Sequence, residues 1–237
     1  MSQRVHYELR AGIAHVRLDD GKANVISLAM SQELAAAFDR AEQEADVLVL
    51  QGRPGIFSGG FDLSTLRAGG ENALAMLNAG FALSVRLAGL RMPVVAACTG
   101  HAMAMGCFLL QAADVRIAVD GAFKIGANEV AIGLPVPYTA LELLRMRLLP
   151  GVYQRAPLCA QLMPPPEACL AGFIDSVVAV EDLDRHVEQL AQQLQALHRP
   201  SYIESKRRLR QPHLQALEQA LQQDAQDFAH LLGKAQA

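Results

Sequence analysis

Apolar and polar residues alternate at the start of the chain, and this pattern predicts two β-strands. Apolar positions recur at every second residue over Arg4–Leu9 and Ile13–Leu18, and the Arg10-Ala11-Gly12 segment between them is typical of a hairpin turn. The period then changes, because Leu28–Glu44 repeats apolar residues at helical spacing and predicts an amphipathic helix. Val47–Leu50 is apolar throughout, which indicates a central strand covered on both faces of its sheet.

The middle of the chain continues this alternation of strands and helices. Such alternation is typical of an α/β fold. The predicted helices are Asn72–Leu90, Met105–Ala112, Tyr138–Leu149 and Ala168–Ala171, the last with Gly172 as a C-cap, and Asp62 is expected to cap a further helix from Leu63. The predicted strands are Val94–Cys98, Val115–Val119, Phe123–Ile125 and an extended segment over Phe173–Val180.

The chain carries no strand signal after about residue 180, and its apolar residues there follow helical spacing. We therefore expect a core over residues 1–180 and an all-helical region over residues 181–237. Pro200 and Pro212 predict breaks that divide this region into three helices. Its apolar stripes must pack on the core or on another subunit. They are Leu183, Val187, Leu190, Leu194 and Leu197, followed by Leu214, Leu217, Leu221, Phe228 and Leu231.

Composition and charge exclude several classes of function. The net charge of −3 gives no general attraction to nucleic acid or to an anionic membrane surface. The four cysteines lack CxxC spacing, no His/Cys/carboxylate cluster suggests a metal site, and the N-terminus has no secretory pattern, so we expect a cytoplasmic protein. Met92–Ala113 holds no charged residue, but Pro93 and Thr99-Gly100 favour a buried strand, turn and helix over a membrane span.

Two glycine-rich stretches each follow a predicted strand. Glycines in Gly52–Leu63 and Gly100–Phe108 allow main-chain N–H groups to point outward, which is the arrangement that binds an anion or a developing oxyanion. Each stretch alone would also suit an ordinary loop. Downstream, Ile125–Pro135 places one carboxylate, Glu129, inside an apolar segment. A buried carboxyl has a raised pKa and is suited to proton transfer near neutrality, whereas an exposed Glu would be a solvated loop residue.

The order of these features resembles the crotonase superfamily of enoyl-CoA hydratases and isomerases. The resemblance covers nearly the whole chain and implies a crotonase-type ββα spiral core of the α/β class with an α-helical C-terminal region. It rests on five ordered segments: Lys22–Ser27, Phe57–Leu63, Pro93–Ala97 continuing through Gly106-Cys107, Ala113–Arg116 and Pro164–Asp175.

The resemblance implies that two main-chain N–H groups, those of Phe61 and Met105, hold a thioester carbonyl and stabilise the enolate. The family usually has glycine where this chain has Ala104-Met105, so a side chain at a turn of positive φ would distort or narrow this oxyanion hole. Hydratases of the family use two glutamates, and Phe108 occupies the first of these positions here. Glu129 occupies the second position, in a segment that looks like that of Δ3-Δ2-enoyl-CoA isomerases, which need a single base.

The resemblance therefore implies an enzyme that shifts the double bond of an enoyl-CoA from C3 to C2, with Glu129 as the base and acid. Coenzyme A is part of the substrate, so no separate cofactor is expected, and the family usually forms homotrimers or dimers of trimers. Lys206-Arg207-Arg208 with Arg210 would either contact CoA phosphates or form a solvated helix face. The implied substrate contacts are Lys22, Ala23, Asn24, Gly59, Gly60, Asp62, Phe108 and Leu134.

Two other functions remain open from the sequence. One is enoyl-CoA hydration or another acyl-CoA reaction on the same scaffold, since a fold does not fix its chemistry. That reaction would need a second polar group from elsewhere in the chain. The other is a non-catalytic acyl-CoA-binding subunit, which the unusual Ala104-Met105 turn keeps open.

Overall fold

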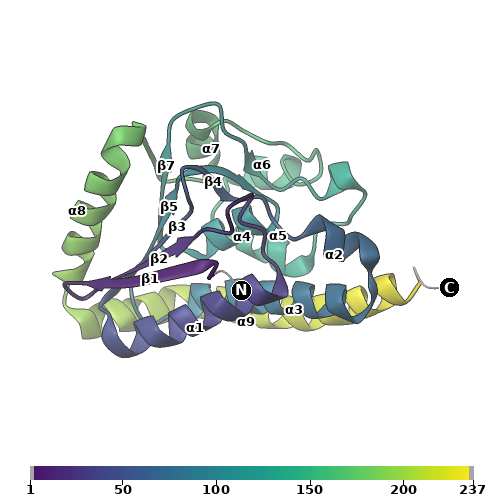
Figure 1. The fold of residues 1–237 in the computed structure, drawn as a ribbon, viewed down its shortest axis with the longest axis horizontal. Helices are drawn as coiled ribbons and strands as arrows, with labels where there is room; N and C mark the ends of the chain where they lie inside the picture. The colour runs from purple at the N-terminus through teal and green to yellow at the C-terminus, as the bar shows by residue number, and fades with distance from the viewer. Residues whose placement is uncertain (1–2, 235–237) are drawn as a thin grey trace.

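Two β-sheets organise the molecule, and the larger one has six strands in the order β1-β2-β3-β5-β7-β9. The computed structural model describes residues 3–234, with side chains described up to residue 230. β1 pairs antiparallel with β2, and the other neighbours in this sheet are parallel (Figure 1). The strands are β1 Val5–Arg10, β2 Ile13–Leu18, β3 Val47–Gln51, β5 Val94–Cys98, β7 Val115–Val119 and β9 Ser176–Val178.

The second sheet is parallel and has three short strands in the order β4-β6-β8. These are Gly55–Ser58, Gly100–Met103 and Ile125–Gly126, and each comes soon after a strand of the larger sheet. The chain therefore repeats a step of two strands and a helix, which confirms the predicted α/β spiral. The sequence pattern predicted β4 and β6 only as glycine-rich loop and turn.

Nine α-helices complete the fold within residues 3–234. Local sequence accounts for several of their ends. The Ser27 hydroxyl caps α1, the Asp62 carboxylate caps α2, and Gly172 ends α7 with φ of 94°. The helices are α1 Leu28–Glu44, α2 Leu63–Ala68, α3 Gly70–Gly89, α4 Met105–Ala112, α5 Tyr138–Arg145, α6 Pro150–Arg155, α7 Pro165–Ala171, α8 Leu183–Gln195 and α9 Arg199–Lys234, with short 3-10 turns at Val130–Ile132 and Val180–Asp182.

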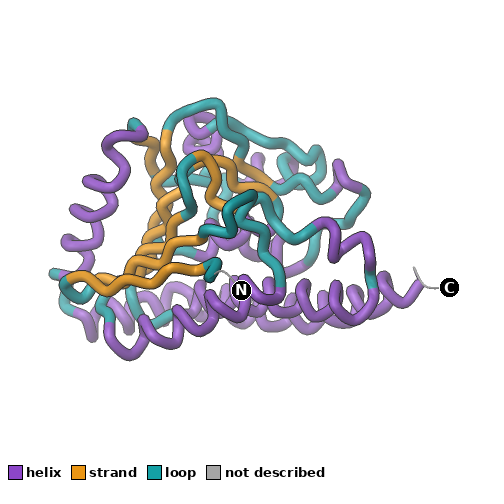
Figure 2. The backbone as a smooth tube through the Cα atoms, in the orientation of Figure 1, coloured by secondary structure: helices purple, strands orange, loops and turns teal. Residues whose placement is uncertain are grey.

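Helices cover both faces of the large sheet, which explains why its central strands are apolar throughout. α8 lies alone on one face, where Leu183, Val187 and Ala191 pack on β3, β5 and β7 (Figures 1 and 2). The opposite face packs on α1, α3 and α4 in the larger apolar cluster. The Met92–Ala113 run is β5, β6 and α4 inside this core, as predicted except for β6. Within residues 3–234 no helix has both the length and the apolar content to cross a membrane.

The predicted break at Pro212 is wrong, because α9 is one unbroken helix of 36 residues that includes Pro212. It packs along α3 and α5. Proline removes one N–H from the helix ladder, but side chains fix α9 to the core on both sides of this position. Lys206 and Arg210 are buried before it, and Leu217 and Asp224 are buried after it. Pro200 lies in the first turn, where a missing N–H costs little. The side chain of Leu231 lies outside the described residues.

Asp114 anchors α9 to the edge of the core. Its Oδ2 accepts hydrogen bonds from Lys206 Nζ at 2.6 Å and from Val94 N at 2.8 Å, and its Oδ1 accepts from Arg210 Nη2 at 2.7 Å. Tyr202 Oη also donates to Oδ2 at 3.1 Å. Burial lowers the pKa of Lys206 to about 8 despite the opposing charge of Asp114. The two buried cations of this helix therefore serve its attachment to the core.

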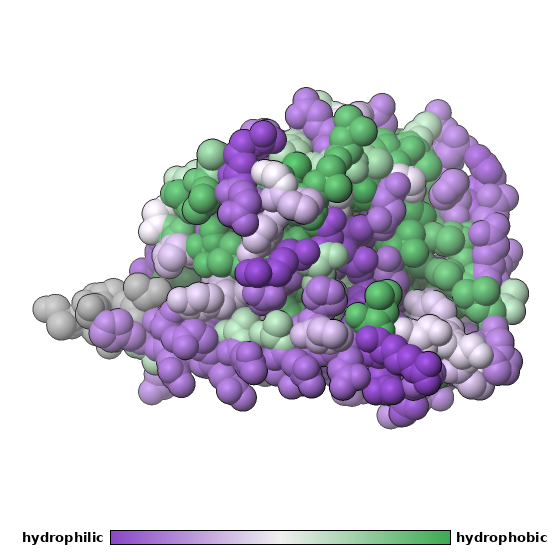
Figure 3. All heavy atoms as spheres, turned by 180° about the vertical axis from the view of Figure 1, so that it is seen from behind, coloured by the Kyte–Doolittle hydropathy of each residue, from purple (hydrophilic) through white to green (hydrophobic). Residues whose placement is uncertain are grey.

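Several large apolar side chains remain exposed on the chain. Figure 3 shows apolar surface above the polar helical layer on the face seen from behind. Oligomer formation commonly covers such residues. The expected homotrimer or dimer of trimers stays a prediction, as does the division of the chain at residue 180. The exposed residues include Leu149, Leu158, Leu170 and Leu209.

Candidate active site

The two glycine turns abut each other. Gly60 has φ of 98°, and a methyl group placed on it would lie 2.8 Å from Ala104 Cβ and 3.4 Å from Met105 N. Met105 begins α4, so its N–H has no partner within the helix. Within the described residues the N–H groups of Phe61 and Met105 have no hydrogen-bond acceptor. Two free donors on adjoining turns can hold one oxygen whose negative charge develops.

The pairing of β6 with β8 brings Glu129 to the same place. Met103 is paired with Gly126, and Ala104 N donates to Gly126 O at 3.1 Å, three residues before Glu129. A 3-10 turn then fixes the Glu129 backbone, because Ile132 N and Leu134 N both donate to its carbonyl at 3.0 Å. Glu129 therefore lies on a short turn held by hydrogen bonds, close to the Gly60 and Ala104 turns.

Glu129 is a buried carboxyl with no charged partner in the described part of the chain. Glu129 is only 6% exposed, which is typical of a core residue. Its Oε2 has no hydrogen-bond partner among the described residues. Desolvation raises its pKa to about 7, although the backbone N–H groups of Glu129 and Asn128 act in the opposite direction. A carboxyl that titrates near neutrality can both accept and return a proton.

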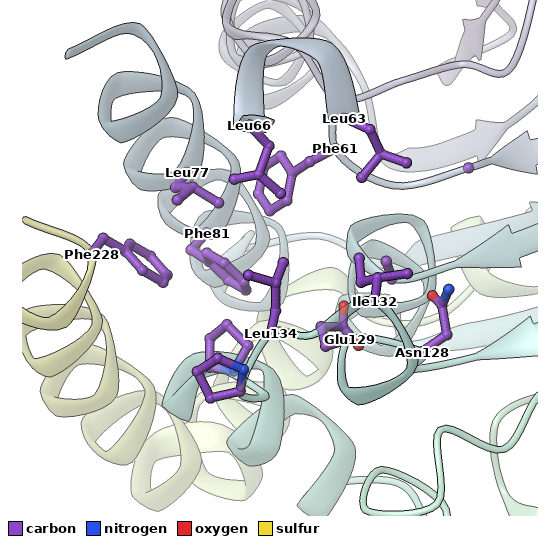
Figure 4. A pocket seen from close by; sticks show the side chains of 14 residues that line it. Phe61, Leu63, Leu66, Leu77, Phe81, Asn128, Glu129, Ile132, Leu134 and Phe228 are labelled. Atoms are coloured by element: carbon purple, nitrogen blue, oxygen red, sulfur yellow. The ribbon is translucent and has the colours of Figure 1, made fainter. Parts of the chain in front are cut away.

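An apolar pocket opens at Glu129. Figure 4 shows its side chains converging from the glycine turns, α2, α3, the Glu129 turn and α9. Polar side chains enter it only from Asn128 and Glu129 among the described residues. Such a pocket suits an apolar chain whose reactive end lies at the carboxyl. The lining residues are Gly59, Phe61, Leu63, Leu66, Leu77, Phe81, Ala104, Asn128, Glu129, Ile132, Leu134, Pro135, Pro137 and Phe228.

Four of the predicted site residues line this pocket, namely Gly59, Phe61, Glu129 and Leu134, whereas Phe108 lies behind the wall. Phe108 is buried and stacks on Phe81 with ring centroids 6.1 Å apart. It therefore supports the lining without forming part of it. The side chain of Met105 is also buried, so its contribution is the main-chain N–H. The Asp62 carboxylate is occupied as the cap of α2, with Ser64 N at 2.9 Å.

The loop predicted to meet CoA lies beside the first glycine turn, since Gly59 N donates to Ala23 O at 2.8 Å. Lys22 is exposed there. Asn24 is fully buried, and its Nδ2 donates to Leu18 O at 3.0 Å and to Phe57 O at 3.2 Å. Its side chain thus joins the loop to the sheet and leaves no free group for substrate.

The basic residues of α9 do not form a common phosphate site. Lys206 and Arg210 are buried against Asp114, which corrects both sequence interpretations for these two residues. Arg207 and Arg208 are exposed and pair with Glu204 at 2.8 and 2.7 Å. His101 has a structural contact, because its Nδ1 accepts a hydrogen bond from Lys124 N at 3.0 Å.

Sequence reasoning missed the pocket residues contributed by distant helices. Leu66, Leu77, Phe81 and Phe228 belong to apolar stripes that signal burial, but a stripe does not say which cavity it faces. Asn128 was also missed, although its Oδ1 is buried without a partner in the described residues. Its position next to Glu129 was the available signal.

Ala104 adopts a backbone conformation that normally belongs to glycine. Its φ is 50° and its ψ is −127°, and its methyl group lies in the pocket wall against Gly60. An L-residue in such a region carries a strain of about 1–3 kcal/mol. The turn therefore carries a side chain at positive φ, which is the condition under which the sequence predicts a distorted or narrowed oxyanion hole.

Ala104→Gly is expected to raise the free energy of unfolding by about 1 kcal/mol, because strain relief exceeds the entropic cost of glycine. Chemical denaturation measures the change. Ala36→Gly, in the exposed middle of α1, is the matched control and should lower stability by about 1 kcal/mol. Equal losses in the two variants would show that Ala104 is not strained.

Comparisons with known proteins agree with the α/β fold of the chain. Residues 8–237 match the family model described as enoyl-CoA hydratase/isomerase. Human mitochondrial enoyl-CoA delta isomerase 1 is 28% identical over 240 residues, which cover 98% of this chain and 80% of that protein. The structure of a probable enoyl-CoA hydratase from Mycobacterium tuberculosis H37Rv is 38% identical, with a TM-score of 0.93 and coverage of 99% and 100%. A second structure of this same Mycobacterium tuberculosis protein, described there as an enoyl-CoA isomerase, is 40% identical, with a TM-score of 0.90 and coverage of 95% and 99%.

Proposed function

Because the chain belongs to the enoyl-CoA hydratase/isomerase family, we propose that it acts as a Δ3-Δ2-enoyl-CoA isomerase. The observation that carries this proposal is the single carboxylate of the pocket. Among the described lining residues only Glu129 can exchange a proton near neutral pH. A double-bond shift needs one such group, whereas the addition of water needs activation of the water as well as protonation of carbon.

The first step places the substrate thioester carbonyl between the N–H groups of Phe61 and Met105. Ionised Glu129 then removes a proton from C2, and the electron pair of that C–H bond moves into the thioester to form a dienolate. The two N–H donors stabilise the negative charge on oxygen, an effect worth on the order of 10²–10³ in rate for each donor. The protonated Glu129 carries the proton for the next step.

The second step returns this proton to C4. The electrons of the dienolate shift back, which leaves the double bond between C2 and C3 and restores ionised Glu129. The apolar lining supports this role in two ways. It raises the pKa of the carboxyl, and it keeps water from competing for the dienolate.

Enoyl-CoA hydration is the second candidate, and Asn128 is the observation in its favour. The unpartnered Oδ1 of Asn128 lies in the same pocket as Glu129 and can accept a hydrogen bond from a water molecule. One similar protein is described as a probable hydratase in one structure and as an isomerase in another, so its description favours neither reaction. An amide cannot supply a proton to carbon as an acid, so this site is less suited to hydration than to isomerisation.

The test offers 3-enoyl-CoA and 2-enoyl-CoA separately to the protein and follows the products by chromatography and mass spectrometry. The 3-enoyl substrate should become the conjugated 2-enoyl isomer without a change in mass. The 2-enoyl substrate should gain no water at a comparable rate. Rapid formation of 3-hydroxyacyl-CoA would favour hydration, and binding without exchange of α-protons into heavy water would favour a non-catalytic subunit.

A further inference from the structure

The far wall of the pocket comes from the C-terminal helix, and nothing in the reaction itself requires it. Phe228 of α9 is buried and lies at the end of the pocket opposite Glu129 and Asn128 (Figure 4). Its ring stacks on Phe81 with centroids 5.7 Å apart. Phe81 and Leu77 continue the wall from α3, so an acyl chain that extended through the pocket away from Glu129 would meet Phe228.

A buried polar contact fixes this part of α9. Asp224, one turn before Phe228, accepts hydrogen bonds from Tyr138 N and Thr139 N, both at 2.8 Å. These N–H groups begin α5, where the helix has no side-chain cap of its own. Asp224 is nearly inaccessible, so its carboxylate is a specific contact between α9 and the start of α5.

The Asp224 contact joins two elements that both line the far end of the pocket, the segment before α5 and the helix α9. The segment before α5 contributes Leu134, Pro135 and Pro137 to the lining, and Phe228 faces them from α9. Asp224 joins these two elements directly. The Asp224 contact therefore holds α9 at a fixed distance from the start of α5. The Phe228 ring fills part of the space between these two elements.

We propose that Phe228 sets the upper limit of acyl-chain length and that Asp224 is the positioning residue that holds it in place. This inference deepens the proposed function and rests on the pocket receiving the acyl group. Each methylene buried in an apolar pocket strengthens binding about fourfold, until the chain meets the end wall. Binding should thus rise with chain length and then stop rising at a definite length.

The test measures dissociation constants for saturated straight-chain acyl-CoA thioesters of increasing length by calorimetry. Phe228→Ala should move the length limit to longer chains, with a gain of about fifteenfold for a chain two methylenes beyond the wild-type limit. Phe228→Trp should move the limit to shorter chains. Leu221→Ala, also on α9 but not in the lining, should leave the limit unchanged.

Shifts in opposite directions cannot arise from general loosening of α9, so that pattern would support the proposal. An unchanged limit in both Phe228 variants, or an equal shift in Leu221→Ala, would overturn it. Saturated thioesters report binding without turnover. A moved limit in a protein that isomerises nothing would therefore reject the proposed function alone, and an active isomerase with an unmoved limit would reject this inference alone.

Asp224→Asn tests the positioning role. Each carboxylate oxygen of Asp224 accepts from one N–H group, and the substitution replaces one of these oxygens with an NH2 group, which cannot accept. The variant should lose the sharp length limit and raise KM for chains near it. The kcat for short chains should stay at the wild-type value, since the Glu129 end of the pocket is untouched. An equal fall in kcat for all lengths would show a merely structural role.

Discussion

Glu129→Gln is expected to lower kcat for isomerisation by about 10³–10⁴ and to leave substrate affinity nearly unchanged. General acid–base catalysis typically contributes about 10²–10⁴, and here one side chain serves both proton transfers. The amide has almost the same shape, so the pocket stays intact. Steady-state kinetics and calorimetry with 3-enoyl-CoA measure the two effects. Glu167→Gln, the same chemical change on the surface of α7, is the control and should change neither.

The pH dependence of wild type should identify the same group. Glu129 must be ionised to remove the first proton, so kcat/KM rises with pH and levels off above its pKa of about 7. Stability moves in the other direction. The pKa of this carboxyl is raised from 4.5 on folding, so between these values the folded state binds more protons and stability falls as pH increases.

Glu129→Gln removes this unfavourable charge and should be more stable than wild type above pH 7, by on the order of 3 kcal/mol. A variant that is inactive and yet more stable cannot owe its inactivity to unfolding. Retention of more than a tenth of wild-type kcat would contradict the role of Glu129 as the sole proton carrier.

Asp114→Ala is expected to lower the free energy of unfolding by about 3–5 kcal/mol. The substitution leaves Lys206 and Arg210 buried beside carbonyl groups but without their counter-charge. Breaking a buried ion pair by removing one partner has a cost of this size, because the remaining charge is no longer compensated. Chemical denaturation followed by circular dichroism measures the change.

Asp39→Ala is the matched control, since Asp39 also pairs with an arginine, Arg86, but on the surface. Exposed pairs contribute about 0–1 kcal/mol, so this variant should stay close to wild type. Similar losses at the two positions would show that burial does not distinguish them. The combined variant Asp114→Ala with Lys206→Met should recover part of the lost stability, because it removes one stranded charge.

The sequence pattern predicted most of the fold because the strong periodic segments are also the buried ones. Leu28–Glu44 and Met105–Ala112 form helices over the predicted residues, and Val94–Cys98 is a strand as expected. β4 and β6 were missed because each has few residues and a glycine, and their partners are remote in sequence. Pro212 was misread for a similar reason, since the contacts that keep α9 straight come from other elements.

The residues of the candidate site also fall into two groups, those with a local sequence signal and those placed by remote contacts. Glu129 was predictable as a lone charge among apolar residues, whereas Phe61 and Met105 were assigned from the family resemblance. Phe228 and Asp224 were not, since both lie in a helix whose docking partner the sequence does not name. Lys206 and Arg210 looked like surface charges until the fold placed Asp114 between them. The candidate proton-transfer residue could thus be predicted from the sequence around it. The residues that bound the pocket could not, because their positions depend on tertiary packing.

Because α9 is unbroken at Pro212, a change in its tilt near Asp114 would also displace its far end. From Arg210 to Phe228 it spans about 27 Å at 1.5 Å per residue. A tilt of about 5° at the Asp114 anchor would move the Phe228 end by about 2 Å, which is more than the length of one methylene step. Substitutions around Asp114 would then alter which acyl chains fit, at a distance and without touching Glu129. Under the proposed role of Phe228, we therefore expect the Asp114 anchor to act together with the Asp224 contact in setting which acyl chains fit.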